Sequence, residues 1–429
     1  MAVNFPQLHL LCPTEDRHSG SRSSTGSSAV VCDFSNRDSL YADFFSNDGS
    51  GSRAIGGCCC LSICVRDLID GWRSSSILVG CAIANSGGFR KILVLYPIFD
   101  WALCQLDVNN AFLNGHLSET VYMKQPPGYE DPTRPDHVCH LQRSLYRLKQ
   151  APRAWFKRLH EFLLSAGFVA SKTDVSLFHY TIGNSHVFLL VYVDDILMMG
   201  NDSSLVTTLL HKLYTTFKIW DLGTPSFFLG IETLHTGSGL VLSQQRYMKD
   251  ILTRAGMSDC KPLATPAAVT QPATPSMDPM DNPTQYRRIV GALQYLTITR
   301  LDMSYAVNRF MHSPTEEHWC ILKQVLRYIK GTQDYGLRLT ASASSDIHAF
   351  SDSDWAGCPI DRKSTSGYAV FLGTNLVSWL SRKQRTVAHS SIEAEYKGLA
   401  DVSAEVTWVV SLLRELGLHS GLTTSGLLI

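Results

Sequence analysis

The sequence lacks both an excess of charge of one sign and any long apolar segment. Lysine plus arginine and aspartate plus glutamate each number 38 in the 429 residues, so no bulk positive charge predicts nucleic-acid binding, and such a site must be a local patch. No apolar run reaches the roughly 20 residues that span a bilayer. No basic segment followed by an apolar core predicts a signal peptide. We therefore expect an intracellular protein that does not enter a membrane.

The sequence also lacks a recognisable zinc pattern, although 12 cysteines are present. Cys58, Cys59 and Cys60 are adjacent, Cys64 follows four residues on, and no histidine lies near them, which does not match a tetrahedral zinc site. We therefore expect reduced thiols. With 45% hydrophobic and 18% charged residues, the chain can build real cores, and its length predicts two or three domains.

Two adjacent carboxylates, Asp194 and Asp195, interrupt the apolar run from Val187 to Met199. Charged groups avoid such interiors unless they are paired or bind a metal. The simplest structure is a β-hairpin with both carboxylates at or beside its turn. Because successive strand residues point to opposite faces, one carboxylate would face a cleft and the other would lie behind it. A carboxylate at a strand end suits Mg²⁺, which takes few protein oxygens and adds substrate phosphates. Turns also favour aspartate, so a plain hairpin turn is the alternative.

A local basic patch is present at residues 141–160. This segment contains no acidic residue and six basic ones: Arg143, Arg147, Lys149, Arg153, Lys157 and Arg158. A solvated helix face is the usual explanation of such a run. Because the segment flanks the predicted metal site, where phosphates would lie, we favour contact with nucleic acid.

Composition divides the chain at two clear places. Residues 1–100 are polar and aperiodic at first and then apolar and rich in cysteine, with candidate strands at Ile77–Ala84 and Lys91–Tyr96. The amino-acid composition changes at Trp101. Six prolines between residues 258 and 283 forbid regular structure and predict an extended linker.

Between and after these boundaries the pattern is that of an α/β protein. Ala102–Val108 is a candidate strand, and Pro152 suits the first turn of a helix that stops at Gly167. Asp202 or Ser203 caps the next helix. Further helices are predicted at 244–255, 284–298, 302–312 and 315–330, followed by strands at 348–352, 367–373 and 376–381 and a long helix at 390–416.

A second carboxylate motif runs from Gln105 to Gly115, with Asp107 after a short apolar stretch and an aromatic, Phe112, five residues downstream. Two-metal phosphoryl transfer needs carboxylates that converge from separate strands. Over roughly residues 101–420 the sequence resembles the Pol polyprotein of copia-type LTR retrotransposons. The segments that carry the resemblance are 107–115, 144–155, 192–195, 228–232, 328–332, 351–357 and 390–396.

The resemblance implies an α/β (α+β) fold with a reverse transcriptase palm, built from a mixed sheet and helices, at residues 101–257. A helical connection region at 284–340 and an RNase H-like α/β domain at 346–429 would follow the linker. Residues 1–100 stand where the fingers and the first palm strands belong, but the expected basic motif is absent, so we expect the fingers to be largely missing. We recognise no family in that segment.

For the polymerase, the resemblance implies that Asp107 and Asp194 bind Mg²⁺, or alternatively Mn²⁺, with Asp195 in support. Two ions would activate the primer 3′-hydroxyl and stabilise the pyrophosphate leaving group. Phe112 matches a steric gate against the 2′-hydroxyl, with core packing as its alternative role. Gln150 matches a residue that contacts the incoming nucleotide or the template, and Lys149 and Arg153 are candidate phosphate contacts. The matching primer grip is Phe228, Leu229 and Gly230, whose alternative role is a core strand turn.

Two positions depart from the family pattern. Arg147 stands where the family usually has glycine, which would obstruct a close backbone approach. Trp220 stands where the family usually has lysine, a proton donor to the leaving pyrophosphate. Lys218 would share the face of Trp220 on a strand, but two residues away, so we expect it to be a weak substitute.

For the RNase H region, Asp352 and Glu395 match metal-binding carboxylates, and Asp354 and Glu393 are neighbours that could be confused with them. The next family motif, an Asp-Asn pair, should follow soon after residue 425, and the sequence ends at Ile429 without it. A two-metal hydrolase needs more than two carboxylates, so we expect RNase H activity to be absent.

Three hypotheses follow. The first is an RNA-directed DNA polymerase that acts on an RNA template, a DNA primer and dNTPs, located by resemblance in a cytoplasmic particle or the nucleus, and impaired by the departures above. The second is a non-catalytic remnant that still binds nucleic acid. The third is a host-recruited interaction module, for which the sequence offers no specific support. The oligomeric state is not predicted.

Overall fold

The computed structural model describes residues 92–99, 101–237, 239–266, 282–308, 315–342, 344–358 and 361–418, and the backbone of three short strands at 8–10, 30–32 and 427–428. Contacts divide the chain into two compact units. The first unit comprises residues 1–69 and 110–162, and the second comprises residues 70–109 and 163–429. Within the described ranges, no helix is long and apolar enough to cross a membrane. The predicted strand at Ile77–Ala84 lies outside the described residues.

The first unit is built around a four-stranded sheet in the order β1-β5-β4-β2. The strands β4 (Val121–Lys124) and β5 (Val138–Leu141) are antiparallel, β1 (Leu8–Leu10) pairs with β5, and β2 (Val30–Cys32) runs parallel to β4. A 3₁₀ helix, η1 (Ala111–Asn114), precedes β4. The helix α4 (Ala151–Ser165) begins in this unit with Pro152 in its first turn, as predicted, and Trp155 and Leu159 are buried one turn apart.

Arg147 in the first unit occupies the left-handed region of the backbone, with φ = +75°. A non-glycine residue in this conformation destabilises the folded state by about 1–2 kcal/mol. Glycine avoids that strain, but the greater backbone entropy that it loses on folding costs about 0.5–1 kcal/mol. Because the Arg147 side chain is exposed, Arg147→Gly should raise the free energy of unfolding by up to about 1 kcal/mol, which calorimetry of the full chain would measure. Arg153→Gly, in the exposed face of α4, is the matched control and should lower it by about 1 kcal/mol. A loss of stability in Arg147→Gly would contradict the prediction.

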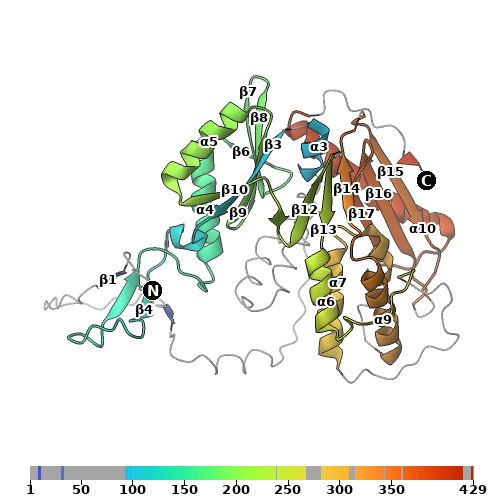
Figure 1. Ribbon diagram of the computed structural model, residues 1–429, viewed down its shortest axis with the longest axis horizontal. Coiled ribbons are helices and arrows are strands. Elements are labelled where there is room, and N and C mark those ends of the chain that lie inside the picture. The colour runs from blue at the N-terminus through green and yellow to red at the C-terminus, as the bar shows by residue number, and fades with distance from the viewer. Residues whose placement is uncertain are drawn as a thin grey trace. The chain divides into compact units, whose positions relative to one another are not determined.

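The second unit contains a six-stranded sheet in the order β10-β3-β9-β8-β7-β6 (Figure 1). Its strands are β3 (Ala102–Val108), β6 (Val169–Ala170), β7 (Leu177–Ile182), β8 (Ser185–Tyr192), β9 (Asp195–Gly200) and β10 (Ile219–Gly223). The strand β3 and the β8–β9 hairpin around Asp194 confirm their predictions. The helix α5 (Ser203–Thr216) packs on β8 and β9, and its N-cap Asp202 accepts hydrogen bonds from the backbone of Ser204 and Leu205.

The prediction that this sheet is mixed is wrong, because every neighbouring pair of its strands is antiparallel. The turns at residues 183–184 and 193–194 are only two residues long, and such turns can join only antiparallel strands. The α5 crossover then returns the chain so that β10 runs antiparallel to β3. Parallel pairs in the described strands occur elsewhere, between β2 and β4 and between β15 (Ile347–Ser353) and β18 (Leu427–Leu428).

The predicted strand at Lys91–Tyr96 is also wrong. Ile92 and Leu93 are helical, and α3 (Leu95–Phe99) follows with Pro97 in its first turn. Residues 92–95 are all buried in the core of the second unit. A short, fully buried apolar run has no alternation, so its sequence pattern cannot distinguish a strand from a buried helix.

A second sheet follows in the order β11-β12-β13-β14. The strands are β11 (Phe227–Phe228), β12 (Ile231–Thr236), β13 (Gly239–Ser243) and β14 (Leu337–Thr340). Leu242 in β13 pairs with Leu337 in β14, so the sheet joins residues from before and after the proline-rich segment. Most of that segment, residues 267–281, lies outside the described residues. Its final proline, Pro283, opens a helix instead of ending the linker.

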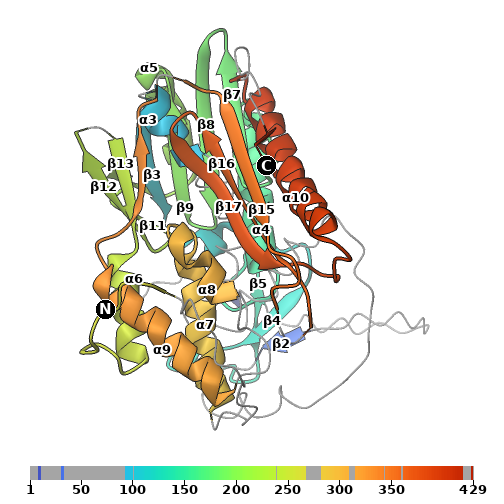
Figure 2. The same cartoon turned by 90° about the vertical axis from the view of Figure 1, so that its right-hand side faces the viewer.

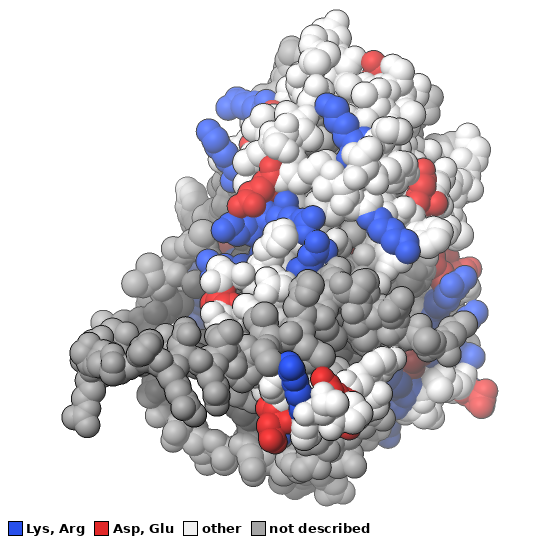
Figure 3. Space-filling view, turned by 90° about the vertical axis from the view of Figure 1, so that its left-hand side faces the viewer, with Lys and Arg blue, Asp and Glu red and all other residues white. Residues whose placement is uncertain are grey.

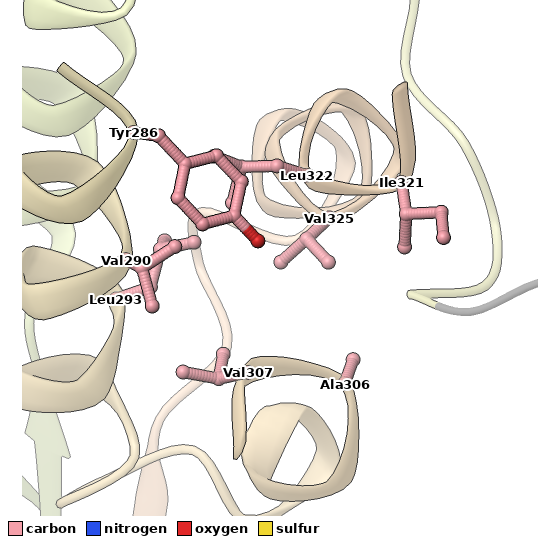
Figure 4. Close-up of a pocket in the computed structure, with 8 residues that line it drawn as sticks. All are labelled: Tyr286, Val290, Leu293, Ala306, Val307, Ile321, Leu322 and Val325. Atoms are coloured by element: carbon pink, nitrogen blue, oxygen red, sulfur yellow. The ribbon is translucent and has the colours of Figure 1, made fainter. Parts of the chain in front are cut away.

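Helices form where they were predicted at 244–255, 284–298 and 315–330, and residues 309–312 of the helix predicted at 302–312 lie outside the described residues. The helices are α6 (Gln245–Arg254), α7 (Pro283–Leu296), α8 (Ser304–Asn308) and α9 (Glu316–Gly331), with the 3₁₀ turn η2 (Leu301–Met303) before α8. The helices α6, α7 and α9 share one apolar core (Figure 2). An apolar cavity between α7, α8 and α9 encloses only about 10 Å³, room for no more than a water molecule (Figure 4).

The last sheet has the order β17-β16-β15-β18, and the long helix α10 (Ser391–Glu415) packs against β15 and β16 (Figure 2). The strands β16 (Thr365–Leu372) and β17 (Asn375–Lys383) are antiparallel neighbours. The three predicted strands and the predicted helix of this region are confirmed. Buried residues of this sheet, of the second sheet and of the six-stranded sheet belong to one core of the second unit.

Candidate active site

The two adjacent carboxylates lie where the β8–β9 hairpin turns. Tyr192 pairs with Asp195, and Val193 and Asp194 form the two-residue loop between them. Val193 has φ = +56° and Asp194 has a negative φ, the pattern of a type II′ turn, which favours glycine at the first position. A β-branched residue in this conformation is strained, and such strain is typical of functional sites.

Asp107 lies directly opposite Asp195, not opposite Asp194. The backbone N–H of Val108 donates to the carbonyl of Asp194 at 2.8 Å, so Asp107 and Asp195 form a non-hydrogen-bonded pair. In such a pair the Cα atoms are about 4.5 Å apart and both side chains point to the same face. The row continues across four strands as Tyr192, Asp195, Asp107 and Trp220.

The carboxylates act on one another electrostatically. The pKa of Asp194 is raised, chiefly by burial and further by the charge of Asp107. The pKa of Asp195 is raised to about 6 by burial and by the charge of Asp194, with a smaller contribution from Asp107 and an opposing hydrogen bond from Gln105. The hairpin end therefore carries half-buried negative charge that a bound cation would neutralise.

Lowering the pH from about 7.5 to about 5 should stabilise the metal-free protein more than its Asp195→Asn variant. The pKa of Asp195, about 6 when folded, exceeds its ordinary value of 3.8, so the folded state binds this proton more tightly than the unfolded state. Stability from this group is therefore gained as the pH falls through 6, and asparagine cannot titrate. Melting temperatures in EDTA would measure the difference between the two proteins. A difference that does not change with pH would contradict the prediction.

A metal ion at this site would take part of its coordination from a substrate. In the part of the chain that the structure describes, no three His, Cys, Asp or Glu side chains are grouped so as to hold a metal ion. The donors present are the facing pair of Asp107 and Asp195, with Asp194 in the adjoining turn. Mg²⁺ is commonly held by one or two carboxylates plus substrate phosphates, so this donor set fits such an ion.

Trp220 is the other neighbour of Asp107, from the edge strand β10. The Trp220 side chain is 56% exposed. Lys218 precedes β10, and its carbonyl accepts a hydrogen bond from the Asn109 N–H at 2.9 Å, so Lys218 lies opposite Asn109, two residues beyond the row. This agrees with the expected offset of Lys218 from the position of Trp220.

The predicted gate Phe112 and the predicted nucleotide or template contacts Lys149, Gln150 and Arg153 lie in the first unit. Phe112 is buried in η1, and its ring meets that of Tyr146 edge to face at 5.0 Å. The Ser144 hydroxyl donates to the Phe112 carbonyl. Packing therefore accounts for Phe112, and its role as a gate stays a prediction. Lys149 and Arg153 are exposed and Gln150 is half-buried, so their roles as substrate contacts also stay predictions.

The basic segment at residues 141–160 includes an ion pair on the exposed side of α4. Lys157 lies 3.9 Å from Glu161, one turn along α4, in a pair whose side chains are both largely exposed. Exposed pairs of this kind contribute little to stability. Lys and Arg side chains stand on the described surface in Figure 3, with acidic side chains scattered among them.

The segment predicted as a primer grip forms the tight β11–β12 turn. Phe228 is buried and pairs with Ile231, and Leu229 and Gly230 both have positive φ values, +49° and +76°. Two such residues define a type I′ turn. The Tyr295 hydroxyl of α7 donates to the Leu229 carbonyl. The core strand turn that we considered as the alternative is present, and contact with a primer stays a prediction.

In the last sheet, Asp352 and Glu395 lie on β15 and α10. Ser351 and Ser353 face α10, because a Cβ added to Gly398 would lie 3.0 Å and 2.6 Å from their hydroxyl oxygens. By strand alternation Asp352 points to the other face, where it is exposed, and Glu395 is half-buried. The metal-binding roles of both residues stay predictions.

Two buried polar residues, Gln105 on β3 and Arg300 before η2, were given no role from the sequence. Gln105 appeared only as the first residue of its motif, yet its side chain contacts Asp195. Arg300 was not singled out, although it is fully buried. Buried polar residues in apolar surroundings were the available signal for both.

Comparison with known proteins shows a match to one protein family and matches to individual retrotransposon proteins. Residues 82–269 match the family described as reverse transcriptase (RNA-dependent DNA polymerase), a match that starts upstream of Trp101. The chain is 48% identical over 341 residues to the retrovirus-related Pol polyprotein from transposon RE2 of Arabidopsis thaliana. The matched segment covers 79% of this chain and 23% of that protein. It is 36% identical over 352 residues to the Pol polyprotein from transposon TNT 1-94 of Nicotiana tabacum, covering 79% and 26%.

A shorter relative is matched over nearly its whole length. It is an uncharacterized mitochondrial protein of Arabidopsis thaliana, 48% identical over 225 residues, which are 52% of this chain and 94% of that protein. Together with the antiparallel sheet and its carboxylate hairpin, these matches define a reverse transcriptase-like protein of a retrotransposon. The chain belongs to the copia-type Pol polyprotein family. It spans about a quarter of the length of the Pol polyproteins it matches.

Proposed function

We propose that the row formed by Asp107 and Asp195, with Asp194 beside it, is the catalytic centre of an RNA-directed DNA polymerase. The single observation that carries the proposal is that Asp107 and Asp195 lie opposite each other on one face of the sheet, with Asp194 in the adjoining turn. The pKa values of Asp194 and Asp195, raised by burial and by neighbouring carboxylates, support it. The substrates would be an RNA template, a DNA primer and dNTPs. The reverse transcriptase match supports this assignment.

In this proposal each part of the chain has a defined task. Asp107 and Asp194 would bind Mg²⁺, or alternatively Mn²⁺, and Asp195 would support them by holding negative charge on the same face as Asp107. Bound Mg²⁺ would supply charge neutralisation at the attacking and leaving oxygens. The β11–β12 turn would hold the primer end, and Lys149, Gln150 and Arg153 would contact the nucleotide or template. Phe112 would limit access of a 2′-hydroxyl by its bulk.

Primer extension by the purified full chain tests this proposal. Extension on an RNA template with dNTPs should require Mg²⁺ or Mn²⁺, stop in EDTA and be lost in Asp107→Asn. The matched control is Asp221→Asn on β10, because Asp221 is paired with Leu106 and so points to the other face of the sheet. Extension that survives Asp107→Asn would refute the assignment. Primer–template binding without extension, in this chain and in Trp220→Lys, would establish the non-catalytic remnant instead.

We also infer an RNase H-like fold for the last sheet with α10. Three antiparallel strands, a long helix and a strand parallel to the first support it, together with the match of Asp352 and Glu395 to the family motif. Asp352 points away from α10, which carries Glu395, and this argues against a metal centre formed by these two carboxylates. Incubation with an RNA–DNA hybrid and Mn²⁺ tests the activity: cleavage that disappears in Asp352→Asn would show that the centre forms with substrate.

A further inference from the structure

Gln105 joins two parts of the candidate active site by a single side chain. It is 5% exposed, and its Nε2 donates to the Phe227 carbonyl at 3.1 Å and to Asp195 Oδ1 at 3.5 Å. An amide NH₂ has two hydrogens, so both bonds can be made at once. Both partners are acceptors only, which fixes the orientation of the amide.

The strand register explains why Gln105 reaches these atoms. Gln105 and Asp107 are two residues apart on β3 and therefore share a face. Asp195 lies opposite Asp107, so Gln105 is its diagonal neighbour across the strand pair. On the other side Gln105 lies opposite Gly223, which offers no side chain to compete for the space. The amide is therefore placed between β9 and β11.

The second acceptor of Gln105 belongs to the strand that enters the β11–β12 turn. Phe227 precedes Phe228, and Leu229 and Gly230 follow as the turn itself. On the far side of the turn, Tyr295 donates to the Leu229 carbonyl, and a Cβ added to Gly230 would lie 3.3 Å from the Tyr295 hydroxyl. The turn is thus fixed to the sheet by Gln105 and to α7 by Tyr295.

We propose that Gln105 is a positioning residue that fixes the Asp195 carboxylate relative to the β11–β12 turn. By doing so it sets the metal affinity of the carboxylate row and the distance from that row to the segment proposed to hold the primer end. The inference rests on the proposed polymerase function. Groups that support a metal site without binding the ion typically change its metal affinity or activity by about 10–100-fold when replaced.

Gln105→Met tests the inference, because methionine has a similar length and flexibility but cannot donate a hydrogen bond. The affinity for Mn²⁺, measured by titration calorimetry of the full chain with primer–template bound, should fall by about 10-fold or more. Hydrogen exchange of the backbone amides around residues 225–232 should become faster. In primer extension, kcat should fall while the Kd for primer–template stays unchanged, a division that a merely structural residue would not produce.

Gln125→Met is the matched control. Gln125 is also buried, its Nε2 donates to the carbonyls of Arg134 and His137, and its Oε1 accepts from the Asp131 N–H. It contacts none of the proposed metal-binding carboxylates, so its loss should reduce stability without changing Mn²⁺ affinity. If Gln105→Met does not fold, Gln105→Asn keeps the amide on a shorter side chain and should show the same changes to a smaller degree.

The outcomes separate this inference from the proposed function. If this chain binds Mn²⁺, Asp107→Asn abolishes the binding and both Gln105 variants bind as the unaltered chain does, the inference is wrong and the proposed function stands. If the unaltered chain binds no Mn²⁺ even with primer–template, both are wrong. Weaker Mn²⁺ binding in Gln105→Met, with normal binding in Gln125→Met, supports the inference.

Discussion

A lysine in place of Trp220 should raise the rate of primer extension by about 100-fold or more. Trp220 pairs directly with Asp107 in the sheet, and its side chain points to the face on which the carboxylates lie. An indole N–H cannot give up its proton at neutral pH, whereas a lysine beside a carboxylate is a general acid. General acids at such positions contribute about 10²–10⁴-fold to rates, and the family resemblance places a lysine here.

Single-turnover extension in Mg²⁺ would measure the effect. Trp220→Met is the matched control: it removes the indole but adds no proton donor, so we expect no gain. Because Trp220 is largely exposed on an edge strand, neither variant should change the melting temperature by more than about 1–2 °C. Equal rates in the lysine and methionine variants would show that the missing proton donor does not limit this chain.

Arg300→Met should lower the free energy of unfolding by about 3–5 kcal/mol. Arg300 is 2% exposed and forms a bidentate ion pair with Asp302, in which Nη2 lies 2.7 Å from Oδ2 and Nε lies 2.9 Å from Oδ1. Its guanidinium also donates to the carbonyl and hydroxyl of Thr332, at 2.9 Å and 2.7 Å, and lies against the rings of Tyr328 and Tyr335. Removing the arginine leaves Asp302 and the Thr332 carbonyl without their charged partner in a half-buried site.

Denaturant unfolding followed by tryptophan fluorescence would measure the loss. Arg254→Met is the matched control, because Arg254 forms an exposed ion pair with Asp250 along α6, and its loss should cost less than about 1 kcal/mol. The double variant Arg300→Met/Asp302→Leu should recover part of the stability, since it removes the buried charge of Arg300 together with the partly exposed charge of Asp302. If Arg300→Met costs no more than Arg254→Met, the buried network does not stabilise this core.

Local sequence signals predicted the elements that these residues occupy. The apolar run 187–199 with Asp194 in its middle has a turn residue at the right place, and a two-residue loop is the compact solution. The helix caps at Asp202 and Gly256 and the amphipathic pattern of α9 are similarly local. These predictions needed only residues within one or two turns of one another.

The contacts that define the site depend on register and on distant residues, so local patterns could not provide them. The sequence indicated one of two adjacent aspartates for the cleft and favoured Asp194, but the strand pairing places Asp195 opposite Asp107. The burial of Arg300 depends on Thr332, 32 residues further along the chain. The strand β14 is only four residues long, and its partner lies on the other side of the proline-rich segment.

The pairing of β13 with β14 also has a consequence for synthesis of the chain on the ribosome. The backbone of Leu242 in β13 can pair with β14 only after Leu337, 95 residues further along the chain, has been synthesised. At about 5–20 residues per second, that interval lasts roughly 5–20 s, during which the β13 edge is a template for pairing with other chains. Nascent chains released before residue 340 would keep that edge open, so premature termination in this stretch should yield aggregates more readily than termination a few residues later.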